Sequence, residues 1–324
     1  MEINLIGLDI GGTKCAVIYG VAQGNELKVV DKLRFPTTGV TETIHNLCSS
    51  IEEMMGKHSL TKERVAAIGI SCGGPLDSVK GIVMSPPNLP GWDNIPIVKT
   101  ITETFGIPAA IQNDANACAL AEWKFGAGRD SRNMVFMTFG TGLGAGLILN
   151  GALYSGTNDN GGELGHIRLS DFGPVGYGKA GSFEGFCSGS GIAQLAKSRV
   201  SEKLQMGEKP ALCASADQLD QITAQRVAEA AVAGDPLAKE IYDISGEYLG
   251  RGLSLVIDML NPELIVIGSI YTRCEQLLAP ACQKVIEREA LPLARKVCRL
   301  VPAELGEAIG DMAALSVAAN IIDN

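Results

Sequence analysis

Residues 8–19 read LDIGGTKCAVIY and residues 134–149 read MVFMTFGTGLGAGLIL, so each stretch holds a glycine–threonine turn between two apolar segments. Apolar, β-branched runs bounded by glycine are typical of strands. They predict strands at Leu5–Asp9, Cys15–Tyr19, Met134–Phe139 and Gly144–Leu149. Because each turn joins two strands, neither is the GxGxxG that opens a helix, and neither matches the phosphate loop GxxxxGK[ST]. Two common nucleotide-binding folds are therefore excluded, and a hairpin-based one remains.

The chemistry of these turns follows from the missing side chains. Glycine has no Cβ, so consecutive backbone N–H groups can converge on a ligand, and such concave sets of donors bind anions, above all phosphate. Asp9, just before the first turn, would hold Mg²⁺ through water, because this hard ion prefers oxygen ligands and retains its waters. Lys14 would balance phosphate charge. Taken alone, either turn is equally well explained as a tight bend without a ligand.

The rest of the chain alternates strands and helices and indicates an α/β protein. Further strands are expected at 27–33, 65–71, 109–112, 152–154 and 264–268, and helices at 41–60, 98–105, 115–125, 237–260 and 310–319. The strand–turn–strand scheme of 8–20 returns at 139–150. At 324 residues one core usually divides into two. We therefore expect two domains with a cleft between them.

Composition excludes several classes of partner. The chain is 46% apolar and 19% charged, with a net charge of −9, which argues against a nucleic-acid surface and a polybasic membrane anchor. The start lacks the features of a signal peptide. The uncharged stretch 133–158 is interrupted by glycines and suits a soluble hairpin better than a spanning helix. Nine irregularly spaced cysteines predict a reduced, cytoplasmic protein without a disulfide scaffold.

Four motifs in order along the chain resemble the ROK family (repressors, open reading frames and sugar kinases). They are DIGGTK at 9–14, NDANA at 113–117, GTGLGAG at 140–146 and ELGH at 163–166. The resemblance implies an actin-like (ribonuclease H-like) two-domain ATPase fold, in which ATP and sugar meet in the interdomain cleft. It places a smaller α/β domain at 1–113 plus 306–324 and a larger one at 114–305.

The same resemblance assigns roles to individual residues. Asp114 becomes the catalytic base. ATP would be bound by Asp9, Gly11, Gly12, Thr13, Lys14, Thr138, Gly140, Thr141, Gly142 and Gly268, with the adenosine side near Gly268 and the helix that starts around Gly310. The sugar would be bound by Asn113, Glu163, His166 and Glu184, with Gly74 and Asn88 on the rim. Two simpler interpretations stay open: Asp114 as the cap of the helix that follows it, and His166 as a structural histidine.

One departure from the family concerns zinc. Many members carry three cysteines after the histidine, and that histidine completes a zinc site. Here the three thiolate positions are Val175, Tyr177 and Ser182. Structural zinc needs four good ligands, and His166 with Cys187 would give two at most. We therefore expect no zinc, and we expect apolar packing of Val175, Tyr177 and Phe183 to hold the loop that presents Glu184.

The function implied is that of an ATP- and Mg²⁺-dependent sugar kinase, a transferase that moves the γ-phosphoryl group of ATP to a hydroxyl, usually O6, of a hexose or N-acetylhexosamine. A homodimer is implied by resemblance only. The alternative is a catalytically weak sugar-binding regulator. Family repressors carry an N-terminal helix-turn-helix, for which we expect no room before the first strand. A larger actin-like chaperone is excluded because no peptide-binding domain is left over.

Overall fold

The structure is a computed structural model that describes residues 2–323. Its two main sheets have five strands each, and the chain divides into two compact units. Unit 1 holds the described residues through Arg132, together with Gly146–Gly161 and the chain from Glu304 onward. Unit 2 holds Asn133–Ala145 and Gly162–Ala303.

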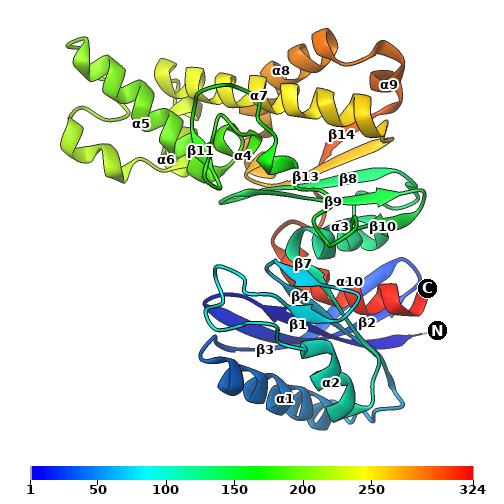
Figure 1. Ribbon diagram of the computed structural model, residues 1–324. Coiled ribbons are helices and arrows are strands. Elements are labelled where there is room, and N and C mark those ends of the chain that lie inside the picture. The colour runs from blue at the N-terminus through cyan, green and yellow to red at the C-terminus, as the bar shows by residue number, and fades with distance from the viewer. Residues whose placement is uncertain (1, 324) are drawn as a thin grey trace. The chain divides into compact units, whose positions relative to one another are not determined.

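The first sheet has the strand order β3-β2-β1-β4-β7 and lies in unit 1 (Figure 1). Its strands are β1 (Ile3–Ile10), β2 (Lys14–Gln23), β3 (Glu26–Pro36), β4 (Val65–Cys72) and β7 (Ala109–Asn113). β1 pairs antiparallel with β2 and parallel with β4, and β4 pairs parallel with β7. The carboxyl ends of β1, β4 and β7 therefore share one edge of the sheet.

Alternation along the strands gives this sheet two buried faces. On one face, side chains such as Ile6 and Leu8 pack against α1 (Val40–Lys57) and α2 (Ile97–Phe105). On the other face, the core includes Leu5 and Leu315 of α10 (Ile309–Asp323). Figure 1 shows α1 and α2 on the face opposite α10.

The second face is packed closely because it carries glycines where a side chain would not fit. A Cβ at Gly69 would lie 2.1 Å from the carbonyl oxygen of Ala314, and one at Gly7 would lie 3.0 Å from the Cβ of Ala314. The alanine-rich helix α10 can therefore lie almost directly on the strand backbones. The helix expected at 310–319 is therefore confirmed.

Helix α3 (Asp114–Phe125) follows β7 without a loop and is anchored at its far end. The fully buried carboxylate of Glu122 accepts hydrogen bonds from the N–H groups of Ala127 at 2.9 Å, Leu305 at 2.9 Å and Glu304 at 3.2 Å. Three backbone donors satisfy this buried charge, as burial requires. The anchor fixes the helix that carries Asp114.

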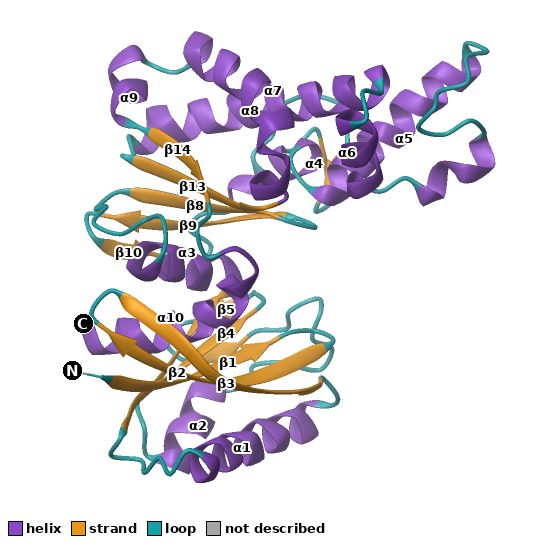
Figure 2. Ribbon diagram, turned by 180° about the vertical axis from the view of Figure 1, so that it is seen from behind, coloured by secondary structure: helices purple, strands orange, loops and turns teal. Residues whose placement is uncertain are grey.

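The second sheet has the order β10-β9-β8-β13-β14. Its strands are β8 (Met134–Phe139), β9 (Leu143–Leu149), β10 (Ala152–Tyr154), β13 (Leu264–Ser269) and β14 (Arg299–Pro302). β13 pairs parallel with both β8 and β14. Figure 2 shows α7 (Pro236–Leu260) and α8 (Ile270–Glu289) along the β13–β14 side of this sheet. The remaining helices of this part of the chain are α4 (Phe183–Phe186), α5 (Gly189–Gln205) and α6 (Ala224–Val232), which pack against α7, and α9 (Pro292–Val297).

Short elements complete the structure. They are the strands β5 (Leu76–Asp77), β6 (Ile82–Val83), β11 (Val175–Gly176) and β12 (Lys179–Ala180), and the single-turn helices η1 (Leu164–His166), η2 (Ala216–Gln221) and η3 (Gly306–Ala308). The strands and helices expected from the sequence are all present, with ends that differ by a few residues. Along residues 2–323 the structure has no helix with both the length and the hydropathy to cross a membrane.

The compact units group the chain differently from the predicted domains. Helix α3 and the segment Gly146–Gly161 belong to unit 1, and the return to that unit falls at Glu304. The sequence places the boundaries at 113/114 and 305/306, and these domain limits stay a prediction.

Candidate active site

The shared carboxyl edge of β1, β4 and β7 gathers polar side chains. The strand register aligns Asp9 with Ser71 and Ser71 with Gln112, so the next residues of β7 and α3 reach the same edge. There the hydroxyl of Ser71 donates a hydrogen bond to Oδ1 of Asp114, over 3.1 Å. The edge therefore holds Asp114 through a neighbouring strand.

Asp114 does not cap helix α3. Asn113 is the cap, because its side-chain oxygen accepts a hydrogen bond of 2.8 Å from the N–H of Asn116. The capping interpretation of Asp114 is thus wrong. Asp114 is exposed, although the protein surrounding its carboxyl group displaces water and raises its pKa, while the Ser71 hydroxyl acts in the opposite direction. Its carboxylate is available for chemistry at the surface of unit 1.

Asp9 lies on the same edge and feels the charge of Asp114. Burial and then that charge raise the pKa of Asp9 to about 6, and Lys32 opposes the rise. Lys32 also forms an ion pair with Asp311 of α10. A carboxyl group whose ionisation is opposed by a nearby carboxylate suits a cation, because a divalent ion would relieve the repulsion.

The raised pKa of Asp9 predicts a pH dependence of stability. The folded state holds this proton up to about pH 6, whereas the unfolded state, in which the pKa of aspartate has its ordinary value of about 3.8, releases it at lower pH. The free energy of unfolding should therefore fall as pH rises from about 4 to 6. Asp9→Asn cannot ionise, so it should be more stable than the natural chain at pH 7, by about 1–3 kcal/mol.

Urea unfolding at pH 4, 5 and 7 measures this difference. The difference between the two free energies of unfolding should be smallest near pH 4. Asp130→Asn is the control, since Asp130 is an exposed carboxylate in the left-handed region, which asparagine tolerates. An Asp9→Asn difference that stays constant across the three pH values would contradict the assignment.

The first glycine turn is braced by its neighbours within unit 1. The N–H of Gly11 donates to the carbonyl of Lys14 at 3.2 Å, and the hydroxyl of Thr37 donates to the carbonyl of Gly11 at 2.5 Å. A Cβ at Gly12 would lie 2.4 Å from the carbonyl oxygen of Asn88. Only glycine lets the Asn88 loop approach so closely.

The predicted sugar-rim residues meet this turn. The side-chain amide of Asn88 lies 3.2 Å from the Cβ position of Gly73, the residue before Gly74. Thr13 and Lys14 are exposed beyond the turn. The structure thus brings the rim residues Gly74 and Asn88 beside the predicted phosphate turn.

The second glycine turn, in unit 2, is held by the start of helix α5. The N–H of Gly140 donates to the carbonyl of Gly142 at 3.0 Å, and the N–H of Gly189 donates to the carbonyl of Gly140 at 2.8 Å. Ser190 donates in the same way to Thr141 at 3.3 Å. The first N–H groups of α5, which lack partners inside the helix, are satisfied by the turn itself.

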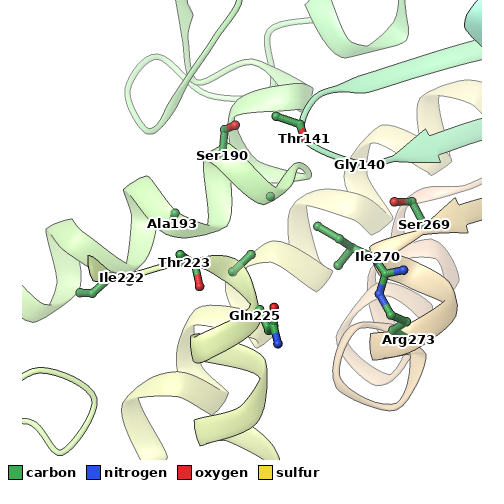
Figure 3. Close-up of a pocket in the computed structure, with 12 residues that line it drawn as sticks. Gly140, Thr141, Ser190, Ala193, Ile222, Thr223, Gln225, Ser269, Ile270 and Arg273 are labelled. Atoms are coloured by element: carbon green, nitrogen blue, oxygen red, sulfur yellow. The ribbon is translucent and has the colours of Figure 1, made fainter. Parts of the chain in front are cut away.

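A pocket of about 480 Å³ opens beside this turn (Figure 3). Its volume is within the range of small-molecule sites. It is lined by the turn and by the starts of three helices: Gly140, Thr141, Gly189, Ser190, Ala193, Ile222, Thr223, Ala224, Gln225, Ser269, Ile270 and Arg273. The lining combines small apolar groups with hydroxyls, an amide and one guanidinium.

Helix α8 gives the pocket an anion-binding end. Ser269, its N-terminal cap, makes no side-chain capping bond. Figure 3 shows Arg273 and Ser269 together on the α8 side of the pocket, across from Thr141 and Ser190. A helix N-terminus and a guanidinium favour an anion, and the apolar residues favour a flat organic group. A nucleotide has both parts.

Some of the predicted ATP-binding residues of unit 2 line this pocket and others do not. Gly140 and Thr141 line it. The side chain of Thr138 lies near the turn, because its hydroxyl oxygen is 3.5 Å from the position of a Cβ at Gly140. Gly268 precedes the lining residue Ser269 in β13. Gly142 lies on the other side of the turn, towards Glu184, and Gly310 belongs to α10 in unit 1.

Glu184 connects the turn with the predicted sugar residues. Its Oε2 accepts a hydrogen bond of 2.9 Å from the N–H of Leu143, and a Cβ at Gly142 would lie 2.7 Å from the same oxygen. The short helix α4 presents Glu184, and Ser182 caps that helix by accepting from the N–H of Gly185 at 3.1 Å. Ser182, at a position where many relatives have a thiolate, thus has a structural role of its own.

Glu163 and His166 flank the single turn η1. Both side chains are exposed, and the N–H of His166 donates to the carbonyl of Glu163 at 3.2 Å. The carbonyl of His166 accepts from Nζ of Lys179 at 2.7 Å. The His166 ring meets the ring of Tyr177 edge-on, with centroids 6.1 Å apart.

The loop at the family's zinc position is held differently from the expectation. The expected packing of Val175 and Tyr177 is wrong, because both are exposed, whereas Phe183 is fully buried as expected. Cys187 is buried and donates from Sγ to the carbonyl of Ser245 at 3.5 Å. Among residues 2–323 no group of three His, Cys, Asp or Glu side chains is arranged to hold a metal.

The structure also adds residues that the sequence did not single out. Ser71 on β4 donates to Asp114, the charge of Lys32 on β3 acts on Asp9, and Thr223, Gln225 and Arg273 line the pocket. None of them lies in a motif. The predicted site residues otherwise fall into two groups, one in each unit.

Comparison with solved structures shows the fold. A ROK family glucokinase from Streptomyces griseus, solved with glucose and AMPPNP, is 26% identical with a TM-score of 0.73, covering 98% of this chain and 99% of that one. A ROK family transcriptional regulator, a homologue of the E. coli MLC protein, is 28% identical with a TM-score of 0.82, covering 97% of this chain and 77% of that chain. The predicted α/β fold of the actin-like ATPase type is confirmed.

Comparison of sequences gives the family. A glucokinase from Halalkalibacterium halodurans is 32% identical over 292 residues, which are 89% of this chain and 86% of the relative. The ROK family profile matches residues 5–321. Together with the four motifs and the two glycine turns, this match shows that the chain belongs to the ROK family.

Proposed function

We propose that the chain is an ATP-dependent sugar kinase that transfers the γ-phosphoryl group of ATP to a hydroxyl, O6 by family analogy, of a hexose or N-acetylhexosamine. The observation that carries the proposal is the state of Asp114. The residue is exposed at the carboxyl edge of β1, β4 and β7, its carboxylate is held by Ser71, and Asn113 rather than Asp114 caps the helix. A kinase needs a carboxylate in this situation to accept the proton of the acceptor hydroxyl.

The proposed reaction follows from these positions. Asp114 accepts the proton of the acceptor hydroxyl as that oxygen attacks the γ-phosphorus, the bond from this phosphorus to the bridging oxygen breaks, and ADP leaves. Base catalysis of this kind contributes about 10²–10⁴-fold. Asn113, Glu163, His166 and Glu184 would hold sugar hydroxyls, with Gly74 and Asn88 at the rim.

Two sets of residues would bind ATP. In unit 2 the pocket beside Thr141 suits the nucleoside and the adjoining phosphates, because Arg273 and the start of α8 supply positive charge there. In unit 1 the turn of Gly11, Gly12, Thr13 and Lys14 suits the terminal phosphates. Asp9, whose ionisation is opposed by Asp114, is the residue that would hold Mg²⁺ through water. The ion would screen phosphate charge.

Zinc is not part of this proposal. With Val175, Tyr177 and Ser182 at the thiolate positions, the residues near His166 do not form a four-ligand set. We expect elemental analysis of the purified protein to find well under one zinc per chain, and sugar phosphorylation in the presence of Mg²⁺ to survive prior dialysis against a zinc chelator. One tightly held equivalent per chain, lost together with activity, would contradict this expectation.

The second candidate is a sugar-binding regulator with little catalysis. The similarity to the ROK transcriptional regulator favours it. The two functions differ in turnover, because a regulator would bind sugar without consuming ATP. A homodimer, a cytoplasmic location and the lack of nucleic-acid or membrane partners stay predictions of the sequence.

A coupled assay of ADP release decides between the two functions. The full-length protein with ATP and Mg²⁺ is screened against hexoses and N-acetylhexosamines, and phosphorylated products are identified by mass and by ³¹P NMR. Release of ADP that depends on one sugar, with an equal amount of sugar phosphate, supports the kinase. Binding of a sugar without turnover would favour the regulator.

A further inference from the structure

The short hairpin of β11 and β12 carries an aromatic residue at an unusual place. Val175 pairs with Ala180 and Gly176 with Lys179, so Tyr177 and Gly178 form a two-residue turn. Their φ angles are 43° and 75°. Such turns favour asparagine, aspartate and glycine, and a bulky residue with positive φ is strained. Tyr177 is nevertheless 80% exposed, so burial does not explain the tyrosine.

The ring of Tyr177 has one aromatic contact, and it is with His166. The two centroids are 6.1 Å apart with an interplanar angle of 75°, an edge-to-face arrangement. Across the described chain, residues 2–323, no hydrogen bond reaches the imidazole nitrogens of His166, while its carbonyl accepts from Lys179. The hairpin therefore contacts His166 twice: Lys179 binds its backbone carbonyl, and the ring of Tyr177 meets its imidazole.

The hairpin itself is fixed to its surroundings. The side-chain amide of Gln194 accepts from the N–H of Val175 at 3.0 Å and donates to its carbonyl at 2.9 Å. Gly176 lies against helix α4, since a Cβ there would be 2.8 Å from the Cβ of Glu184. The hairpin thus joins the backbone that carries His166 to the helix that carries Glu184.

We propose that Tyr177 is a positioning residue, which holds the imidazole of His166 in the orientation that the sugar site uses. The inference rests on the proposed sugar kinase activity and adds to it a residue at one of the three positions where many family members have a thiolate. An edge-to-face ring pair limits rotation of the exposed imidazole about its side-chain bonds. Without that contact the imidazole samples several rotamers, and sugar binding has to select one of them.

Tyr177→Asn is the informative change, because asparagine suits the positive φ and keeps the turn while it removes the ring. Tyr177→Phe keeps the ring and loses only the hydroxyl. Phe172→Asn is the matched control, since Phe172 is also 80% exposed in unit 2. Circular dichroism and thermal melting should show all three variants folded.

The first measurement is NMR of the histidine ring carbons and protons, which needs no activity. The chain has three histidines, so the His166 signal separates from those of His45 and His58. Tyr177→Asn should shift the His166 signal because the ring current of tyrosine is lost. Tyr177→Phe and Phe172→Asn should leave it in place. A His166 signal unchanged in Tyr177→Asn would overturn the proposal.

The second measurement is steady-state kinetics with the sugar found in the screen. Tyr177→Asn should raise the KM for sugar about three- to tenfold, the range that an edge-to-face ring pair is worth, with kcat and the KM for ATP unchanged. Tyr177→Phe should keep the KM for sugar at the value of the natural protein. An equal change in both KM values, or none, would overturn the proposal. Failure of every sugar in the screen would refute the proposed kinase, while the NMR result would still decide the role of Tyr177.

Discussion

Asp114→Asn is expected to lower kcat for sugar phosphorylation by about 10²–10⁴-fold while ATP and sugar still bind. The substitution keeps the size of the side chain and can still accept the hydrogen bond from Ser71. It removes the charge that takes the proton of the acceptor hydroxyl. Because Asn113 caps helix α3, the change leaves the start of that helix intact.

Turnover and binding are measured separately for this variant. Coupled ADP release gives kcat, and calorimetry with a nonhydrolysable ATP analogue gives the nucleotide Kd. Asp130→Asn, an exposed carboxylate change in the same unit, should keep the natural kcat. If Asp114→Asn turned over sugar at the natural rate, the base would have to be another residue.

Glu184→Ala is expected to lower kcat/KM for sugar about 100-fold, the size expected for loss of hydrogen bonds to a charged group, at about 1.5–3 kcal/mol each. The carboxylate has two roles in the proposal, since it would bind sugar and it accepts from the N–H of Leu143 beside the second glycine turn. Its loss should therefore raise the KM for ATP as well as for sugar.

Glu184→Gln provides the graded comparison. Glutamine keeps one oxygen that can accept from Leu143, so the KM for ATP should return towards its natural value while the sugar KM stays raised. Glu247→Ala, an exposed change on helix α7, should leave both KM values as they are. If Glu184→Ala changed the KM for sugar but left the KM for ATP at its natural value, Glu184 would have no part in ATP binding through the second glycine turn.

Local sequence signals predicted much of the fold. The glycine turns, the strands around them and the helix after Asn113 are encoded by neighbouring residues, and each lies where the pattern indicates. Strand β14 (Arg299–Pro302) was missed because it is short and forms an edge, with only β13 as its partner. Its place depends on pairing with a distant segment, which periodicity does not report.

The site shows the same limit. Asp114 and Glu184 were found through motifs, but Ser71 was not, because a single serine at a strand end carries no signal without the register of β1, β4 and β7. The sequence offered Asp114 as the helix cap and did not consider Asn113, and side-chain geometry assigned the cap to Asn113. A role for Tyr177 could be inferred only from its ring contact with His166, which the sequence does not predict.

The most direct test of the central claim is a crystal structure of the full-length protein with a nonhydrolysable ATP analogue, Mg²⁺ and the sugar identified in the screen. We expect the nucleotide in the pocket beside Thr141 and Arg273, and the Asp114 carboxylate about 2.6–3.2 Å from a sugar hydroxyl that faces the γ-phosphorus. A nucleotide bound elsewhere, or a sugar hydroxyl out of reach of Asp114, would contradict it.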